Sequence, residues 1–399
     1  MHRHLKTGTL ILLILAATLS MQVAQSKLDV SSIQLPKGFT IKVFADAKTK
    51  HGALLESARF MAFDKHGDLY VSITKSGKIV KVIDTNHDGV ADDVQTVVEN
   101  LNSPQGMVFL DEILLIANQD GVVKVEGLFT TPAEKPTVKV TPFISNLAIG
   151  RHTRKSLKLS PDGYLYINVG SSCNVCIEAD ATRATILRYT LDGKPAGALL
   201  TLGRHQQSAI WAYGLRNSQG FAWHPKSGDM YATNDGSDMR SDTKGGKEND
   251  ELPPEHLNRI EAGKHYGWPY CWGNQVQDPN FVGEKDFCKT TQAPAITFTA
   301  HTTPIGITFL DKSTFPQAYE NDAIVALHGS WNRKLPAGYK LVRVRFDAQA
   351  KPIAVEDFAT GWLVGKNPWG RPVDVVVGTD GALYVSDDFA NTIYRITHP

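Results

Sequence analysis

One histidine stands among basic residues at the start of an alternating, strand-like segment. It is His152, in GRHTRKSL, with Arg151 and Arg154 beside it. An unperturbed imidazole has a pKa of about 6.5, so it can accept a proton at neutral pH. The chain has 13 histidines, and a structural role is the ordinary expectation for any one of them. Because other polar segments occupy equivalent positions along the chain, we identify His152 as a candidate general base.

Three further arginines lie next to predicted strands in equivalent segments. They are Arg216 in RNSQG, Arg333 in WNRK and Arg371 in WGRPVD. Arginines gathered on one face require an anionic partner, such as a carboxylated or phosphorylated ligand bound in bidentate fashion. The alternative is pairing with acidic residues such as Asp235 and Asp374. Trp331, close to Arg333, offers a flat surface on which a planar ring could stack.

The segment DTNHDGVADD, which begins at Asp84, has the alternating oxygen donors of an EF-hand calcium loop, with Gly89 at the sharp turn. It lacks a glutamate at the twelfth loop position, where Gln95 stands, and it follows a predicted strand instead of a helix. We therefore interpret it as the exit turn of the first structural unit. A plain acidic turn and a structural calcium site both fit this interpretation. The calcium ligands would be Asp84, Asn86, Asp88 and Asp92.

A second oxygen-rich connection contains NDGSDMRSD and, further on, the triplet NDE at 249–251. It is predicted either to hold calcium or to form a solvated loop. No GxGxxG followed by a helix, P-loop, HExxH or GxSxG motif occurs in the chain. Dinucleotide binding, nucleotide triphosphate binding, zinc proteolysis and nucleophile-elbow hydrolysis therefore have no supporting motif.

An internal repeat must position these residues. A strand–turn–strand phrase with alternating apolar residues recurs and has the pattern of a β-hairpin. Its copies are RFMAFDKHGDLYVSIT, GMVFLDEILLIANQD, SLKLSPDGYLYINVG, GFAWHPKSGDMYATND, GITFLDKSTFPQAYENDAIVALHG and PVDVVVGTDGALYVSDD. Each copy is followed by a further strand. Six such units predict an all-β, six-bladed β-propeller, whereas an irregular β-sandwich would leave the six copies unexplained.

The same pattern predicts how the ring closes and where its site lies. The early strand GFTIKVFAD would pair with the last blade. Long amphipathic helices are absent from the pattern, and only short turns such as PPEHLNRI could be helical. Propellers place their sites on loops around the central channel, and the polar segments described above all flank hairpin strands. One domain, residues 27–399, is therefore expected to hold one site at the channel.

The N-terminus has the order of a secretory signal peptide. A short basic segment precedes the apolar run TLILLILAATLS and then polar residues, which predicts cleavage between Ala24 and Lys27 and a signal peptide of residues 1–26. An uncleaved anchor is the alternative, although the run is shorter than the ~20 residues that span a bilayer. The chain has 42 basic and 41 acidic residues, so nothing indicates a nucleic-acid partner. The protein is predicted to be exported, to the periplasm or outside the cell, without a later membrane span.

Because the protein is predicted to be exported, its four cysteines are expected to form disulfides. Four cysteines can pair in three ways, and proximity along the chain favours Cys173 with Cys176 and Cys271 with Cys288. CNVC could instead be a redox pair, but no thioredoxin-like βαβ pattern surrounds it. It is also no haem attachment site, because Ile177 stands where a histidine would follow. Two structural disulfides are therefore predicted.

Taken together, these segments resemble the soluble quinoprotein sugar dehydrogenases, and in particular the L-sorbosone dehydrogenase and pyranose dehydrogenase group. The resemblance runs over nearly the whole mature chain, from LPKGFTIKVFA to DDFANTIYRI. Its most specific segments are GRHTRKSL, VGSSCNVC, AYGLRNSQGFAW, HYGWPYCWG, LHGSWNR and WGRPVDVVVGTDGALYVSDD. These families are six-bladed propellers that use pyrroloquinoline quinone (PQQ) and calcium to oxidise sugars.

The resemblance implies roles for several candidate residues. His152 stands at the histidine of an H-x-x-x-x-L motif, which is the family's general base. It would take the proton of a sugar hydroxyl while hydride moves to the quinone. Arg216 and Asn217 match an arginine–asparagine pair near the cofactor. Arg371 matches an arginine that neutralises the carboxylates of PQQ and its developing negative charge.

Calcium and substrate are placed by the same resemblance. Gly236 and Ser237 align with a turn whose backbone carbonyls hold calcium at the edge of PQQ, with Asp235 nearby. The ion would polarise the quinone oxygen as a Lewis acid. Gln105, in NSPQG, stands where a glutamine faces the substrate, and we assign Arg151 to the substrate as well.

The sequence also departs from the family pattern. His301 and His328 stand where soluble glucose dehydrogenases carry a cofactor-binding threonine and lysine, and Val373 replaces a second arginine. We assign both histidines to the cofactor, together with Trp331 and Arg333. Arg333 would compensate for the lost arginine, as the pyranose dehydrogenase branch suggests.

The sequence therefore predicts a PQQ- and calcium-dependent dehydrogenase acting on an aldose, sorbosone or related sugar. No haem motif is present, so the electrons would pass to a separate acceptor. A calcium-dependent propeller lactonase is one alternative, and it would need ion-binding carboxylates at the channel centre. A non-enzymatic extracellular binding propeller is another, and it would not need His152 and the arginines to converge.

Overall fold

The structure is a computed structural model that describes residues 30–129, 138–198, 208–281, 283 and 285–399. The predicted signal peptide, residues 1–26, lies outside the described residues. Within the part that is described, no helix is long and apolar enough to cross a membrane.

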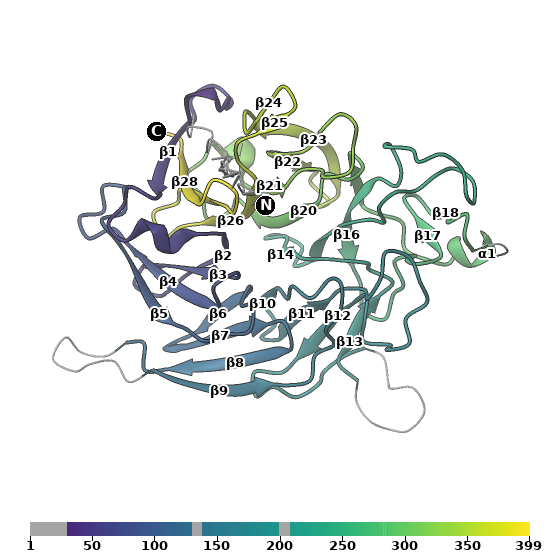
Figure 1. The fold of residues 1–399 in the computed structure, drawn as a ribbon, viewed down its shortest axis with the longest axis horizontal. Coiled ribbons are helices and arrows are strands. Elements are labelled where there is room, and N and C mark those ends of the chain that lie inside the picture. The colour runs from purple at the N-terminus through teal and green to yellow at the C-terminus, as the bar shows by residue number, and fades with distance from the viewer. Residues whose placement is uncertain (1–29, 130–137, 199–207, 282, 284) are drawn as a thin grey trace, which may run out of the picture.

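Six four-stranded antiparallel sheets, here called blades 1 to 6, form a ring (Figure 1). Blade 1 contains β2 (Ala58–Phe63), β3 (Leu69–Ile73), β4 (Lys78–Ile83) and β5 (Asp93–Val98). Blade 2 contains β6 (Met107–Leu110), β7 (Ile113–Asn118), β8 (Gly121–Glu126) and β9 (Lys139–Ile144). Blade 3 contains β10 (Leu157–Leu159), β11 (Leu165–Val169), β12 (Thr185–Tyr189) and β13 (Ile210–Tyr213).

The second half of the ring follows the same order. Blade 4 contains β14 (Phe221–Trp223), β15 (Met230–Asn234), β16 (Glu255–Ile260) and β19 (Ile296–Phe298). Blade 5 contains β20 (Pro304–Phe309), β21 (Ala323–Leu327), β22 (Lys340–Phe346) and β23 (Pro352–Ala359). Blade 6 contains β26 (Pro372–Val377), β27 (Leu383–Asp387), β28 (Thr392–Thr397) and β1 (Thr40–Ala45). The predicted six-bladed propeller is therefore confirmed.

Short elements lie between the blades. They are β17 (Cys271–Trp272), β18 (Val276–Gln277), β24 (Leu363–Val364), β25 (Asn367–Pro368), α1 (Lys285–Cys288), and the 3₁₀ turns η1 (Val30–Ser32), η2 (Gly52–Leu55) and η3 (Gln317–Tyr319). The segment PPEHLNRI, expected as a possible helical turn, is instead largely strand β16, so that expectation is wrong. Its backbone pairs with β15 on one side and β19 on the other, and this pairing outweighs the weak local preference.

Burial changes from the second strand of a blade to its outer edge. The second strands β3, β11, β15, β21 and β27 are buried at every position. The outer strand β9 is instead largely exposed. Neighbouring blades cover both faces of the second strands, which explains why they are rich in Val, Ile, Leu and Tyr. The first strands lie innermost and neighbour one another around the channel.

The N-terminal strand closes the ring, as predicted. β1 pairs antiparallel with β28, from Thr40 opposite Thr397 to Val43 opposite Tyr394. Phe39, just before β1, makes edge-to-face contacts with Phe315 and Phe358 of blade 5, with ring centroids 4.8 and 5.2 Å away. The first described strand is thus held by the last blade and by its neighbour.

The DTNHDGVADD segment joins β4 to β5, so it lies within blade 1 and not at its exit. The fourth strand, which sequence analysis did not identify, begins at Asp93. Both predicted disulfides are present, Cys173–Cys176 and Cys271–Cys288.

Replacing Phe39 tests the closure of the ring. Phe39→Ala removes a buried ring from the contact between the N-terminal segment and blade 5, and should lower the free energy of unfolding by about 3 kcal/mol or more. Ile353→Ala on β23, at a side chain that is 53% exposed, is the matched control and should change it by about 0.5 kcal/mol or less. Chemical denaturation followed by tryptophan fluorescence measures both. Equal midpoints for Phe39→Ala and the unmodified protein would contradict this role for Phe39.

Candidate active site

Two sets of loops meet at one mouth of the channel. Successive strands of a blade are antiparallel, so the start of its first strand and the end of its second strand lie at the same end. His152, Arg216 and Arg371 precede first strands, whereas Asp235 and Asp388 follow second strands. Contacts between blades confirm that these loops converge, since His328 Nε2 of blade 5 lies 2.8 Å from Asp388 Oδ1 of blade 6.

A basic cluster, defined as Arg59, Arg154 and Arg371, faces Asp388. Arg59 is fully buried and forms an ion pair with Asp388. Burial, followed by repulsion from Arg154, lowers the pKa of Arg59 to about 9. Arg371 donates from Nε and Nη2 to the carbonyls of His328 and Gly329, at 3.2 and 2.8 Å. Among the described residues, neither Arg154 nor Arg371 has a carboxylate within ion-pair distance. Three guanidinium groups therefore face one carboxylate, which leaves positive charge available for an anion.

Asp388 also holds His328. Burial lowers the pKa of His328 to about 4, so the imidazole is neutral near pH 7 and donates from Nε2 to the carboxylate. Burial alone would raise the pKa of Asp388, but His328 and Arg59 together hold it well below its usual range. Asp388 thus remains ionised at the centre of the basic cluster.

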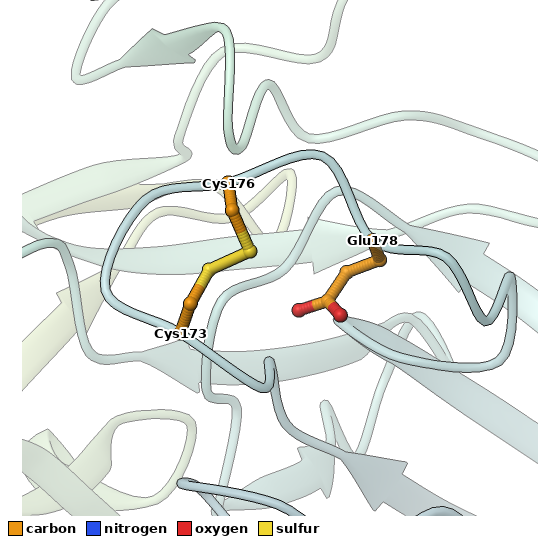
Figure 2. A group of neighbouring side chains, drawn as sticks. All are labelled: Cys173, Cys176 and Glu178. Carbon is orange, nitrogen blue, oxygen red and sulfur yellow. A yellow bond between two sulfur atoms is a disulfide. The ribbon is translucent and has the colours of Figure 1, made fainter.

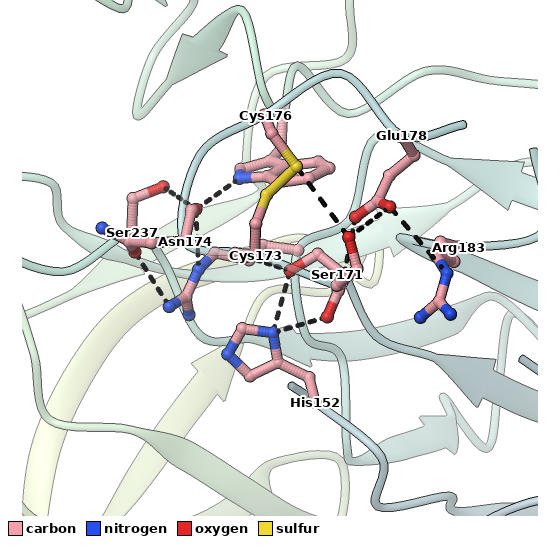
Figure 3. The surroundings of a disulfide bond; sticks show 11 residues. His152, Ser171, Cys173, Asn174, Cys176, Glu178, Arg183 and Ser237 are labelled. Atoms are coloured by element: carbon pink, nitrogen blue, oxygen red, sulfur yellow. Dashed lines mark hydrogen bonds and ion pairs between the residues drawn. A yellow bond between two sulfur atoms is a disulfide. The ribbon is translucent and has the colours of Figure 1, made fainter. Parts of the chain in front are cut away.

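The hydrogen bonds of His152 fix its tautomer. Its Nδ1 lies 3.0 Å from the carbonyl oxygen of Ser171 and 2.8 Å from Ser171 Oγ (Figure 3). A carbonyl oxygen only accepts, so Nδ1 carries the proton and Nε2 keeps a free lone pair. Burial, followed by the positive charge of Arg216 and then Arg151, lowers the pKa of His152 to about 3. His152 is therefore neutral at physiological pH, with its basic nitrogen turned away from Ser171.

Arg216 is paired with acidic side chains, which was the alternative considered from the sequence. Its Nη2 donates to Asp238 Oδ2 at 2.8 Å and its Nη1 to Asp235 Oδ2 at 3.2 Å. The other acid considered, Asp374, instead accepts from the backbone amide of Met61 at 3.0 Å. A direct contact between Arg216 and a cofactor stays a prediction.

An acidic cluster, defined as Asp235, Asp238 and Glu255, surrounds Arg216. Burial, followed by the charge of Asp235, raises the pKa of Glu255 well above its usual value, and burial also raises the pKa of Asp235. Asp238 and Glu255 are buried and Asp235 is half-buried. Their ligand atoms do not all lie within 4.8 Å of one another, so a metal site here stays a prediction. The predicted calcium turn lies here, since the Gly236 amide donates to Glu255 Oε2 at 2.5 Å. Ser237 Oγ donates away from this cluster, to the carbonyl oxygen of Asn174 at 3.3 Å.

Two loops of blade 5 lie at the edge of the site: Trp331 and Arg333 lie between β21 and β22, and His301 precedes β20. Arg333 pairs with Glu251 at 2.5 Å and also donates to the carbonyl oxygen of Ala300 at 3.3 Å, so it is outside the basic cluster. Trp331 is 62% exposed, which leaves its ring open to a ligand. His301 is buried, and burial lowers its pKa. The cofactor roles of these three residues stay predictions.

The two residues assigned to the substrate differ in position. Gln105 is fully buried, accepts from Arg59 Nε at 3.3 Å and donates to Gln219 Oε1 at 3.1 Å. In this structure Gln105 supports Arg59, and its contact with a substrate stays a prediction. Arg151 is exposed at the mouth of the channel, beside His152.

The Asp84 loop satisfies its own oxygen atoms. Asp84 Oδ2 accepts from the Gly89 amide at 2.9 Å, Asp88 Oδ1 from the Val90 amide at 2.9 Å, and Asp92 Oδ2 from the Thr85 amide at 2.7 Å. Asn86 donates from Nδ2 to Asp88 Oδ2 at 3.0 Å. These bonds are sufficient for a stable turn, and calcium binding by this loop stays a prediction.

In the described part of the chain, one group of His, Cys, Asp and Glu side chains brings three ligand atoms within 4.8 Å of one another. It is Cys173, Cys176 and Glu178 (Figure 2). The two sulfur atoms are bonded to each other, so this group has a structural role and does not form a metal centre.

Sequence analysis missed several residues of the site, namely Arg59, Asp388, Asp238, Glu255, Ser171 and Asn174. A signal was present for two of them. Arg59 begins the first hairpin copy and Asp388 ends the last, which are the positions where propeller strands reach the mouth of the channel. The acidic cluster gave a weaker signal, because Glu255 lies far along the chain from Asp235.

Comparison with known proteins places the chain in a family. A family model described as TrAA12-like matches residues 34–399. The chain belongs to the TrAA12-like family. This TrAA12-like protein is 29% identical over 380 residues to an uncharacterized protein of Borreliella burgdorferi. The alignment covers 92% of this chain and 91% of the relative. It is 26% identical over 263 residues to the aldose sugar dehydrogenase YliI of Escherichia coli, with 63% of this chain and 62% of that protein covered.

Solved structures share the fold of this TrAA12-like protein. An iodide structure and a calcium structure of the Trichoderma reesei carbohydrate-active enzyme of family AA12 have TM-scores of 0.76 and 0.75 at 19% identity. They cover 92% of this chain and 98% and 97% of the solved chains. The holo form of the pyranose dehydrogenase PQQ domain from Coprinopsis cinerea has a TM-score of 0.71 at 20% identity and covers 92% and 97%. The resemblance identified from the sequence is thereby confirmed.

Nuclear magnetic resonance tests the state of His152. Its side-chain signal, assigned by its loss in His152→Asn, should show a protonated Nδ1 and an unprotonated Nε2, and should not titrate between pH 7 and 5. Because the unfolded imidazole has a pKa of about 6.5, the unfolded chain binds the extra proton first. This group therefore lowers the stability of the fold as the pH falls from about 6.5 towards 3. A signal that titrates near its unfolded value would contradict the geometry at Ser171.

Proposed function

We propose that this protein is an exported dehydrogenase that uses PQQ and calcium to oxidise an aldose, sorbosone or related sugar. One observation carries the proposal: a neutral His152, whose Nε2 is free, lies at the same mouth of the channel as the basic cluster. The names of the relatives support it, since one is called an aldose sugar dehydrogenase and another a pyranose dehydrogenase PQQ domain. Two disulfides fit an exported protein.

The residues at the channel fit a planar tricarboxylate. Arg154 and Arg371 carry charge that no ion pair neutralises among the described residues, and Arg59 has a buried Nη2 without a hydrogen-bond partner. Asn217 Oδ1 is a second buried polar atom without a partner. A Cβ atom added at Gly170 would lie 3.2 Å from Asn217 Oδ1 and 2.5 Å from His152 Cβ, so Asn217 is next to the base. We therefore assign Arg59, Arg154, Arg371 and Asn217 to the cofactor.

The acidic cluster is where we place calcium. Asp235, Asp238 and Glu255 face the single guanidinium of Arg216, and burial raises the pKa of Asp235 and of Glu255. A bound cation would favour the ionised forms of these carboxylates. A calcium structure of the Trichoderma reesei relative supports the assignment of this ion. Gly236 and Ser237 would contribute backbone carbonyl oxygens.

The reaction would use the chemistry of bound PQQ as hydride acceptor, with calcium polarising the quinone oxygen. His152 Nε2 takes the proton of the sugar hydroxyl as its C–H bond breaks. The Ser171 carbonyl keeps the proton on Nδ1, so the ring does not turn and the free lone pair stays directed at the substrate. Arg151, exposed beside His152, contacts the sugar at the mouth of the channel. The electrons leave to a separate acceptor.

Removal of the base tests the proposal. The mature protein with PQQ and Ca²⁺ should reduce a dye with at least one sugar of an aldose and sorbosone panel. His152→Ala should lower kcat about 10²- to 10⁴-fold while PQQ absorbance is retained. His87→Ala, at an exposed histidine on the β4–β5 turn, is the matched control and should keep full activity. Absence of dye reduction with every sugar, without retained cofactor, would refute the function.

Cofactor affinity tests the basic cluster. Arg371→Ala removes an unneutralised guanidinium from the channel, and the loss of a charged hydrogen bond should raise the Kd for PQQ about tenfold or more. Arg345→Ala, at a surface arginine paired with Glu356, is the control and should leave the Kd unchanged. Titration followed by PQQ fluorescence gives both values. An unchanged Kd in Arg371→Ala would show that the cofactor lies elsewhere.

A further inference from the structure

The loop closed by Cys173 and Cys176 contacts both halves of the site. It follows β11 and contacts His152, through Ser171, and Arg216, through Asn174, and these two residues come from different connections between blades. Figure 3 shows Ser171 between the histidine ring and the loop that carries Cys173 and Asn174. The loop is thus placed to set the geometry of the base and the arginine together.

On the side of the base, the loop orients Ser171. Ser171 Oγ donates to the carbonyl oxygen of Cys173 at 2.7 Å. Since its proton points at Cys173, an oxygen lone pair is left to accept from His152 Nδ1 at 2.8 Å. The position of the Cys173 backbone therefore decides which way the Ser171 hydroxyl points, and through it supports the tautomer of His152.

On the side of the arginine, the loop provides Asn174. Its backbone carbonyl accepts from Arg216 Nε at 3.2 Å and from Trp268 Nε1 at 3.1 Å. Its side-chain Oδ1 accepts from Arg216 Nη2 at 3.0 Å and from the Asp238 amide at 2.8 Å, while Nδ2 donates to the Asp238 carbonyl at 2.8 Å. Asn174 therefore holds both the guanidinium and the acidic loop that pairs with it.

The backbone of this loop is held by side-chain contacts and the disulfide, and not by backbone–backbone hydrogen bonds within the described part of the chain. Residues 172–179 take part in no backbone–backbone hydrogen bond among the described residues, whereas Ser171 still donates to the Arg216 carbonyl at 2.8 Å. Outside the ladder of β11, the disulfide and side-chain contacts alone define the path of the chain. The sulfur atoms of Cys173 and Cys176 belong to half-buried residues, whereas Cys271 and Cys288 are buried.

We propose that the Cys173–Cys176 disulfide, here called the clasp, fixes the positions of His152 and Arg216 relative to each other. The form with this disulfide intact would then be the active form. The proposal rests on the proposed function for its effect on turnover, but not for its effect on His152. Ser171 and Asn174 are positioning residues, because they act through His152 and Arg216. The half-buried bond is the one that a small reductant reaches first.

Reduction opens the clasp by ordinary thiol–disulfide exchange. Dithiothreitol transfers two electrons and two protons to the S–S bond, which yields the thiols of Cys173 and Cys176 and the cyclic disulfide of the reagent. The Cys173 carbonyl and Asn174 are then free to move. His152 Nδ1 keeps one acceptor, the Ser171 carbonyl, and loses the fixed hydroxyl.

The test combines reduction with a double variant. Apo protein is reduced with dithiothreitol, desalted and analysed for free thiols, and the His152 ring signal is followed by nuclear magnetic resonance. We expect two thiols per chain, a shifted and broadened His152 ring signal because the Ser171 hydroxyl is no longer fixed, and an unchanged thermal midpoint. The proton should stay on Nδ1, because the Ser171 carbonyl remains as its acceptor. Reoxidation should restore the original signal. An unchanged His152 signal after verified opening of Cys173–Cys176 would overturn the proposal.

The variant Cys173→Ser/Cys176→Ser is the matched control for the reagent. It should show the same shifted His152 ring signal without reductant and no further change with it. After reconstitution its kcat should be lower about tenfold or more, with a smaller change in KM, because a misplacement of about 1 Å can cost about 100-fold. If no sugar is oxidised by the unmodified protein but the His152 signal responds to reduction, the proposed function falls and the clasp stands. A variant with normal kcat and an unchanged His152 signal would refute the clasp.

Discussion

The site exists because the ring closes. β1 comes from the beginning of the described chain and β28 from its end, and their pairing joins distant residues, as Thr40 and Thr397, 357 positions apart, show. Without this pairing, blade 6 would have an exposed outer edge. Blade 1 also contacts blade 6 directly, since the Met61 amide donates to Asp374 Oδ2 at 3.0 Å. The ion pair between Arg59 and Asp388 spans the joint between the first and last blades. The joint that closes the ring is therefore also the place where Arg59 pairs with Asp388.

The mouth of the channel is divided by charge. The basic cluster lies at blades 1, 3 and 6, and the acidic cluster lies on blade 4, with Arg216 inside it. An anion on the first side and a divalent cation on the second would neutralise both at once. A calcium-dependent lactonase would instead need ion-binding carboxylates at the centre, where this structure has Arg59, His328 and Asp388. A propeller without enzymatic activity would have no need for an imidazole held in one tautomer.

The sequence was sufficient to predict the fold and the positions of the loops, because each blade repeats the same hairpin pattern. It also predicted that His152, Arg216 and Arg371 lie at one mouth of the channel, because each stands before a first strand, and their roles stay predictions. It was not sufficient to predict which charges pair. Arg333 meets Glu251, which is 82 residues earlier, and Arg59 meets Asp388, which is 329 residues later. Such partners depend on how loops of neighbouring blades meet, and no local pattern encodes that meeting.

The low basicity of His152 is informative about the state that reacts. Burial, Arg216 and Arg151 together lower its pKa to about 3, well below the range in which a general base works best. Burial alone is a fixed property of the fold, but the contribution of the arginines depends on what else occupies the channel. An anion bound beside them would offset part of their charge and raise the pKa of His152, whereas burial, the largest cause of its low value, would remain. We therefore expect proton abstraction by His152 to be easier when an anionic ligand is in place than when the channel is empty.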